Sequence, residues 1–274
     1  MTILVLGSRG NLGAEFVRIA STEFEIIRGS NLPKTEVECQ VIPSVGITIP
    51  NNSSVDLIIN FANAYYPVPN YEQKKEMFDS IVGVAEAIRN FNADKGIPVI
   101  TFASYFQFAP ANLQPWSSYS LLKDEASSVY SSMNSKWSEI VLRDNYGGAR
   151  RNKFFDRVLE ASYLGIQLDA TEGKSLINLI HIQDICNYVI SLVRQIKSGT
   201  HEEVDRVELR AEVSLSLQEL VALIDIIRGT TTKVNWGALS YRTHEVFQDW
   251  NSAPVPKLWK PTNSIEDYIR NFGS

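Results

Sequence analysis

Short apolar runs alternate with amphipathic helical stretches along the first half of this sequence, and that alternation limits the possible folds severely. Residues 2–6 and 56–61 are apolar runs too short for helices, whereas residues 71–91 carry apolar side chains at helical spacing. Further strands are predicted at 24–27, 98–102 and 139–143, a weaker one at 46–49, and further helices at 11–20 and 120–133. Strands and helices in this order form parallel βαβ units. We therefore expect an α/β fold, a Rossmann-like doubly wound parallel sheet with a smaller C-terminal lobe.

The alternation becomes irregular after about residue 145. Helices are predicted at 154–163, 185–196, 217–227 and 265–272, and prolines at 254, 256 and 261 keep the intervening stretch irregular. We expect residues 1–145 to form the sheet domain and residues 180–197 to return to it. Residues 146–179 and 198–274 are expected to form the smaller lobe.

Composition excludes several classes of protein. The 274 residues are 44% hydrophobic and 21% charged, which is typical of a globular protein, and the net charge of −5 disfavours a nucleic-acid partner. No apolar run is long enough for a membrane span, and no export signal is recognised. The two cysteines cannot form a disulfide framework, and neither has metal-ligand spacing. We expect a cytoplasmic protein without a bound metal.

Three glycines follow the first predicted strand and open the first predicted helix. Gly7, Gly10 and Gly13 allow a tight turn and let a pyrophosphate approach backbone N–H groups at the positive end of the helix. A plain strand-to-helix turn, the alternative, needs one glycine rather than three. We therefore predict a dinucleotide site that includes Asn11 and Leu12 within this loop.

The charges near this loop indicate which dinucleotide binds. NAD sites usually carry an acidic residue at the end of the second strand, and here that strand ends with Arg28 and Ser30. Arg9 lies within the glycine loop. Guanidinium groups and a hydroxyl suit a 2′-phosphate, so we predict NADP(H) as the cofactor of residues 1–145. The alternative for Arg28 is a solvated strand end.

Tyr119 and Lys123 lie four residues apart at the start of a predicted helix, on one helical face. A nearby ammonium favours the phenolate, so it is expected to lower the tyrosine pKa and make the phenol a usable acid. Ser104 follows the predicted strand at 98–102, at the sheet edge where ligands bind. The spacing of tyrosine and lysine also occurs often by chance, and the alternative is a packing tyrosine beside an unrelated surface lysine.

These motifs together resemble the extended short-chain dehydrogenase/reductases, in the branch of nucleotide-sugar epimerases, dehydratases and reductases. The resemblance extends over nearly the whole chain and includes the segments at 7–13, 56–62, 141–148 and 179–184, together with Ser104, Tyr119 and Lys123. It implies that Ser104 binds a substrate carbonyl, Tyr119 transfers a proton and Lys123 also holds the nicotinamide ribose. Residues expected beside the cofactor are Phe61, Ala62 and Asn63. Two segments depart from the family: Ser80 stands where an asparagine is common, and residues 144–148 are shorter than usual.

The resemblance also narrows the reaction. Dehydratases of this branch carry carboxyl groups where this chain has residues 104–107, Ser-Tyr-Phe-Gln, and epimerases commonly carry the acidic residue on the second strand. Residues 236–245 and 258–261 are similar to segments of the CDP-sugar 4-ketoreductases, the abequose and paratose synthases. The implied function is NADPH-dependent reduction of the 4-keto group of a CDP-linked 6-deoxyhexose, as in O-antigen biosynthesis. A nucleotide-sugar 4-epimerase with bound NAD and a non-catalytic NADP-binding sensor remain as alternatives.

The substrate would be a nucleotide-diphosphate sugar, and its diphosphate requires cations. The residues expected to bind the substrate are Ser104, Tyr105, Asn145, Arg151, Lys153 and Arg242. A solvated helix start is the alternative for Arg151 and Lys153. Relatives dimerise through the helix at 71–91 and the helix that carries Tyr119, so the resemblance implies a homodimer.

Overall fold

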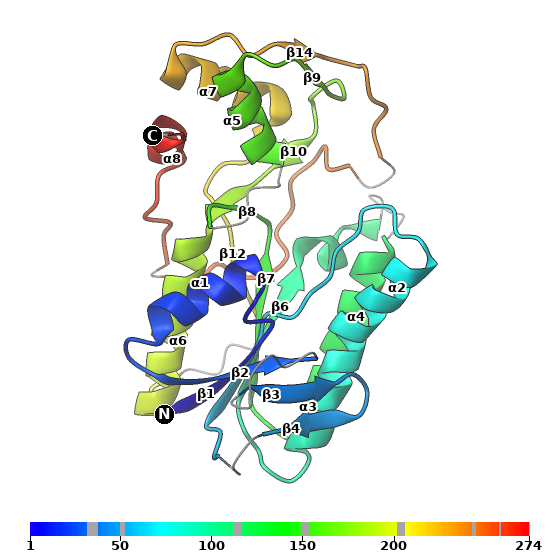
Figure 1. The fold of residues 1–274 in the computed structure, drawn as a ribbon, viewed down its shortest axis with the longest axis vertical. Coiled ribbons are helices and arrows are strands. Elements are labelled where there is room, and N and C mark those ends of the chain that lie inside the picture. The colour runs from blue at the N-terminus through cyan, green and yellow to red at the C-terminus, as the bar shows by residue number, and fades with distance from the viewer. Residues whose placement is uncertain are drawn as a thin grey trace.

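A computed structural model describes residues 1–31, 38–49, 53–111, 117–148, 154–201, 206–242, 245–257 and 259–273. A large sheet with helices on both faces forms the lower part of the molecule in Figure 1, and a smaller, mainly helical lobe lies above it. The sheet has eight strands, and every neighbouring pair is parallel except the last. In order across the sheet they are β12 (Arg206–Leu209), β7 (Trp137–Leu142), β6 (Val99–Ser104), β5 (Leu57–Asn60), β1 (Thr2–Leu6), β2 (Glu25–Ser30), β3 (Cys39–Ile42) and β4 (Gly46–Thr48). The predicted Rossmann-like fold is confirmed.

Helices cover both faces of this sheet (Figure 1). One face carries α1 (Asn11–Ala20) and α6 (Ile182–Ser198). The other carries α4 (Ser118–Ser131) and a long helical segment made of α2 (Tyr71–Phe78), a π-helical turn η2 (Asp79–Gly83) and α3 (Val84–Asn92). Side chains of β1 alternate between the two cores, because successive strand residues point to opposite faces. Since both faces of the sheet centre are buried, the central strands β1 and β5 are mainly apolar, as the sequence indicated.

The smaller lobe packs three helices around its own apolar core, which includes Phe155, Leu159, Leu220 and Ile269. The helices are α5 (Phe154–Leu164), α7 (Leu217–Arg228) and α8 (Ile265–Asn271). Three short strand pairs join further segments of this part of the chain. They are β8 (Asp144–Tyr146) with β11 (Leu179–His181), β9 (Leu168–Asp169) with β14 (Val234–Asn235), and β10 (Leu176–Ile177) with β13 (Leu215–Ser216). Ser216 caps α7 in a capping box with Glu219.

Two parts of the large sheet differ from the sequence-based expectation. β12 pairs with β7, although its residues were expected in the smaller lobe. The strand alternates charged and apolar residues, and its two charges are neutralised by ion pairs, Arg206 with Glu139 and Glu208 with Arg143. Sequence patterning could not reveal this, because the partners lie more than sixty residues away in the chain. The second difference is β3, a strand that was not predicted, which pairs with β4 in an antiparallel hairpin.

Both cysteines, Cys39 and Cys186, are buried and unbridged. Within the described residues, no cluster of three or more histidine, cysteine or acidic side chains is arranged to hold a metal ion. A helix long and apolar enough to cross a bilayer is likewise not found in those parts of the chain.

Candidate active site

The turn after β1 is too tight for side chains at its glycines. Gly7 has a φ of +71°, and a Cβ atom there would lie 2.4 Å from the backbone nitrogen of Ala62. A Cβ atom on Gly13 would lie 2.3 Å from the carbonyl oxygen of Gly7. The N–H of Gly10 closes the turn by donating to the Gly7 oxygen at 2.9 Å. The glycines therefore bring three backbone segments into contact at the start of α1, which has no acidic residue in its first turn.

A cleft of about 750 Å³ opens beside this turn, at the carboxyl ends of β1, β2 and β5. Gly7, Gly10, Ser30, Asn63 and Ser80 are among the residues that line it. Ser80 belongs to the π-helical turn, and its hydroxyl accepts a hydrogen bond from the Ala64 N–H at 3.0 Å. This serine thus anchors the loop after β5. The tight cradle, the helix N-terminus and the cleft fit a dinucleotide.

Arg9, Ser30 and a third residue, Glu38, form a polar group at the end of β2. The Arg9 guanidinium donates to the Ser30 hydroxyl at 3.2 Å and to the Glu38 carboxylate at 2.6 Å. Arg28 is exposed, does not line the cleft and takes no part in these two contacts. Two of the three residues predicted for a 2′-phosphate are therefore adjacent, and a carboxylate lies beside them. Glu38 was not predicted, because it lies beyond the end of the second strand and meets Arg9 only in the folded chain.

Two other residues of the glycine loop face the sheet and the smaller lobe. The Asn11 side-chain amide donates to the Gly147 carbonyl oxygen at 3.0 Å, and Leu12 packs against the apolar core beneath α1. Asn145 lies on β8, where it pairs with Ile180 of β11. The segment after β7 is therefore tied directly to the loop that would hold a pyrophosphate.

Tyr119 and Lys123 lie in the first turns of α4, whose N-cap is Ser117. The Lys123 ammonium donates to the carbonyl oxygen of Phe102 at 2.8 Å and lies 5.9 Å from the centre of the Tyr119 ring. Ser104 is buried at the end of β6, two residues after Phe102. The structure thus brings Tyr119, Lys123 and the strand end bearing Ser104 together at the carboxyl edge of the sheet.

The electrostatics of this group differ from the sequence-based expectation. Burial raises the pKa of the Tyr119 phenol well above its usual value, and a hydrogen bond with Asn63 only partly opposes this. Burial also lowers the pKa of Lys123 to about 8, while Glu139 acts to raise it. The sequence predicted a lowered phenol pKa, but burial raises it instead, and the ammonium, 5.9 Å from the ring centre, does not offset that rise.

The loop after β5 joins the glycine turn to the catalytic candidates. The Phe61 ring stacks on Phe102 at 4.7 Å between ring centres, and the Ala62 backbone touches Gly7. Asn63 then bonds to Tyr119, and the Tyr65 ring meets the Tyr119 ring edge-on at 5.0 Å. Residues 61–63, predicted to lie beside a cofactor, therefore lie between the dinucleotide cradle and the phenol. Tyr65 was missed, although its position just after a buried strand was an available signal.

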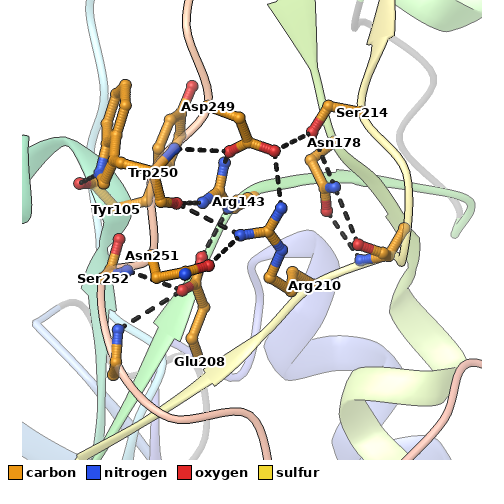
Figure 2. A network of polar contacts seen from close by, with 12 residues as sticks. Tyr105, Arg143, Asn178, Glu208, Arg210, Ser214, Asp249, Trp250, Asn251 and Ser252 are labelled. Atoms are coloured by element: carbon orange, nitrogen blue, oxygen red, sulfur yellow. Dashed lines mark hydrogen bonds and ion pairs between the residues drawn. The ribbon is translucent and has the colours of Figure 1, made fainter.

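Tyr105 forms part of a packed wall beside Ser104. Its side chain is 6% exposed, and it lies 5.3 Å from Trp250 and 5.0 Å from the Arg143 guanidinium, measured to its ring centre. Figure 2 shows how Arg143 is held: it bonds to Glu208 at 2.6 Å, to Asp249 at 2.5 Å and to the Trp250 carbonyl oxygen. Substrate contact by Tyr105 stays a prediction.

Comparison with known proteins places this geometry in context. The sequence matches no family profile and no curated protein. Solved structures match along nearly the whole chain. MoeE5 in complex with UDP-glucose and NAD has a TM-score of 0.74 at 16% identity, over 98% of this chain and 96% of that chain. A UDP-glucose 4-epimerase from Thermotoga maritima has a TM-score of 0.72 at 12% identity, over 98% and 96%. A dTDP-4-dehydrorhamnose reductase from Clostridium acetobutylicum has a TM-score of 0.69 at 15% identity, over 93% and 89%.

The chain has the fold of these solved structures. In this fold, Arg242 of the smaller lobe is exposed, and its charge reaches Tyr65: burial raises the Tyr65 pKa, and Arg242 partly opposes that rise. Arg242 therefore lies on the side of the molecule that carries Tyr119. Arg151 and Lys153, the other predicted diphosphate ligands, lie outside the described residues.

Proposed function

We propose that this protein is an oxidoreductase that reduces the 4-keto group of a nucleotide-linked 6-deoxyhexose with NADPH. The observation that carries the proposal is the placement of a phenol, an ammonium and a serine at one edge of the sheet, beside a glycine cradle. Tyr119, Lys123 and Ser104 supply these groups. A non-catalytic sensor that binds NADP, one of the alternatives left by the sequence, would not need such a proton donor.

The chain's own residues divide the chemistry among them. The Ser104 hydroxyl donates to the keto oxygen and orients it. When bound in the cleft, a reduced nicotinamide would supply the hydride that carbon 4 of the sugar accepts. The Tyr119 phenol gives its proton to the developing alkoxide, and the resulting phenolate is stabilised by the Lys123 ammonium. A phenol with a raised pKa stays protonated until the alkoxide, a stronger base, forms beside it.

The cofactor would lie in the cleft with its pyrophosphate at the N–H groups of residues 7–13. Arg9 and Ser30 offer a guanidinium and a hydroxyl to a 2′-phosphate, and Glu38 opposes that phosphate by its charge. NADP(H) is the proposed cofactor, and its preference over NAD depends on Arg9 outweighing Glu38. Glu38 also supports the rival function, a 4-epimerase that retains NAD, because a carboxylate can accept a hydrogen bond from the ribose 2′-hydroxyl.

The nucleotide sugar is supported by the similar structures, which include complexes or enzymes of UDP-glucose and a reductase of a dTDP-linked keto sugar. A CDP-sugar is proposed because residues 236–245 resemble a segment of CDP-sugar 4-ketoreductases. Arg242, with Arg151 and Lys153, would bind the diphosphate. Exposed apolar side chains such as Tyr71 on α2 and Leu121 on α4 support the proposed homodimer.

A substrate panel tests the proposal. Purified protein is mixed with CDP-, dTDP-, GDP- and UDP-linked 4-keto-6-deoxyhexoses, and the loss of NADPH absorbance is followed. Stoichiometric oxidation of NADPH, fastest with the CDP-sugar, is expected. Interconversion of 4-epimers by protein that carries NAD, without net oxidation, would instead establish the epimerase. Binding of NADPH with no turnover of any sugar would overturn the enzyme proposal.

A further inference from the structure

The catalytic lysine candidate is buried close to a carboxylate that the sequence did not single out. Glu139 lies on β7, is 2% exposed, and favours the charged form of Lys123. Both residues line a cavity of about 10 Å³ between α4 and the sheet, with a volume on the order of one water molecule. A buried ammonium requires a compensating charge, and Glu139 is placed to supply it.

Hydrogen bonds hold this carboxylate on both sides. One oxygen of Glu139 accepts from the Ser127 hydroxyl at 2.5 Å, and the other accepts from Nε of Arg206 at 2.5 Å. Ser127 lies one turn after Lys123 on α4, so the contact with Glu139 also fixes the helix against the sheet. The carboxylate therefore cannot turn away from the lysine without breaking two short bonds.

The same network reaches the serine of the site. The Gln107 side chain donates to the Ser127 hydroxyl at 3.2 Å and accepts from the Ser104 N–H at 2.8 Å. These contacts connect the strand end bearing Ser104 to Glu139 through two side chains. Each of these groups is buried, so the bonds are shielded from water.

We propose that Glu139 is a positioning residue that keeps the Lys123 ammonium charged and in place, with Arg206 limiting the strength of its effect. The proposal deepens the function proposed above, since it rests on the role given to Lys123. Arg206 is partly exposed at the outer edge of the sheet, stacked on the Phe108 ring at 4.5 Å. The positive charge of Arg206 partly neutralises the Glu139 carboxylate, and so weakens the effect of that carboxylate on Lys123.

Other titratable groups around the cavity are accounted for. Tyr119 and Tyr130 lie on α4, and burial raises the pKa of both phenols well above the usual value, so both are neutral at pH 7–9. The Tyr130 hydroxyl accepts a hydrogen bond from Asn60 at 2.7 Å. His201 shares the outer pocket with Arg206 and bonds to Ser138 at 3.2 Å. Titrations of Lys123 are therefore carried out above pH 7, beyond the ordinary titration range of histidine.

A titration without substrate tests the electrostatic part. Protein labelled with ¹³C at the lysine ε-carbons is titrated by NMR, and the Lys123 signal is assigned by its loss in Lys123→Arg. Glu139→Gln, which keeps hydrogen-bonding atoms but no charge, is expected to lower the midpoint of Lys123 by about one pH unit or more. Arg206→Met is expected to raise it, because the full charge of Glu139 then acts on the lysine. Glu208→Gln removes a buried carboxylate of the neighbouring strand and serves as the matched control, with no shift expected.

Activity then tests the catalytic part with the sugar that the panel identifies. The alkaline limb of kcat/KM is expected to move to lower pH in Glu139→Gln and to higher pH in Arg206→Met. Equal midpoints in all three proteins would overturn the inference even if reduction is observed. Shifted midpoints in a protein without reductase activity would overturn the proposed function and leave the coupling in place. Should Glu139→Gln fold poorly, the upward shift in Arg206→Met decides alone.

Discussion

Lys123 donates a hydrogen bond from its ammonium to the carbonyl oxygen of Phe102 at 2.8 Å. This bond fixes the start of α4 to the end of β6, one helical turn from Tyr119 and two residues before Ser104. The lysine is therefore a mechanical link as well as a charge. Replacing it disturbs the spacing of all three residues, so loss of activity in a lysine variant cannot be assigned to charge alone.

Removing the Tyr119 hydroxyl tests the proton donor directly. In Tyr119→Phe, NADPH-dependent reduction is expected to fall by about 10²–10⁴-fold, the usual contribution of a general acid. Cofactor affinity should change little, because the ring remains. Stopped reactions with the active sugar measure turnover, and fluorescence titration measures NADPH binding. Tyr163→Phe on α5, where the ring is exposed and lies beside Arg228 of the smaller lobe, is the control. Retained turnover in Tyr119→Phe would remove the tyrosine from the mechanism.

The preference for NADPH over NADH is expected to depend on two opposing charges, the attraction of a 2′-phosphate by Arg9 and its repulsion by Glu38. Arg9→Met should weaken NADPH binding by about 10-fold or more, since a charge-assisted bond contributes about 1.5–3 kcal/mol, and leave NADH binding nearly unchanged. Glu38→Gln should shift the preference toward NADPH, because the repulsion of the phosphate is removed. Calorimetry with both cofactors measures the ratio. Arg28→Met tests the other predicted arginine: a loss equal to that of Arg9→Met would show that both contact the phosphate.

The glycine cradle is expected to tolerate no methyl group. In Gly13→Ala the added carbon meets the Gly7 carbonyl oxygen at 2.3 Å, so the turn must open and the N–H groups must move. Dinucleotide affinity should fall at least about 10-fold, measured by calorimetry with NADPH. Gly46→Ala has open space around the new carbon and should bind the cofactor like the parent protein. Unchanged affinity in Gly13→Ala would place the pyrophosphate elsewhere.

The ion pair of Arg143 and Glu208 is expected to matter for stability because both side chains are buried. Glu208→Ala leaves the Arg143 charge without one of its partners, and the free energy of unfolding should drop by about 3–5 kcal/mol. Urea denaturation measures the change. Lys174→Met breaks an exposed pair with Glu172, which water screens, so it should change the stability far less than Glu208→Ala. Similar losses in the two variants would contradict the burial argument.

Stability should also depend on pH through Lys123. Its pKa of about 8 in the folded protein lies below the ordinary lysine value, so the unfolded chain binds more protons between these values. The charged lysine destabilises the fold below pH 8, and this cost is relieved as the pH rises toward 10. The difference in unfolding free energy between the parent protein and Lys123→Met should therefore change in favour of the parent between pH 7.5 and pH 10. A constant difference would indicate an unshifted lysine.

Much of the fold could be predicted from local pattern. The strands at the centre of the sheet, the glycine turn and the helix with Tyr119 and Lys123 all carry short-range signals, such as an apolar run ended by glycine or a spacing of four. The same rules failed for β12, whose charged residues find partners only in the folded chain. Glu38 and Glu139 escaped for the same reason, because their importance lies in contacts with residues distant in sequence.

The direction of the Tyr119 pKa shows another limit. Helical spacing correctly placed the lysine near the tyrosine ring, but the degree of burial is a property of the packed structure. Desolvation reverses the sign that a charge pair in water would give. Spacing in the sequence therefore identifies which groups lie together, whereas their pKa values depend on how deeply the fold buries them.

The position of α6 and β12 has a consequence for how this chain is made in the cell. One face of the large sheet is covered by α6, and the sheet ends at β12, yet both are synthesised after α5 of the smaller lobe. A nascent chain that has emerged only to about residue 145 exposes the apolar surface formed by residues such as Val5, Ile59 and Ile140. The large-sheet part of the molecule therefore completes its packing only after β12 has been synthesised, and shorter nascent chains expose apolar surface that favours aggregation.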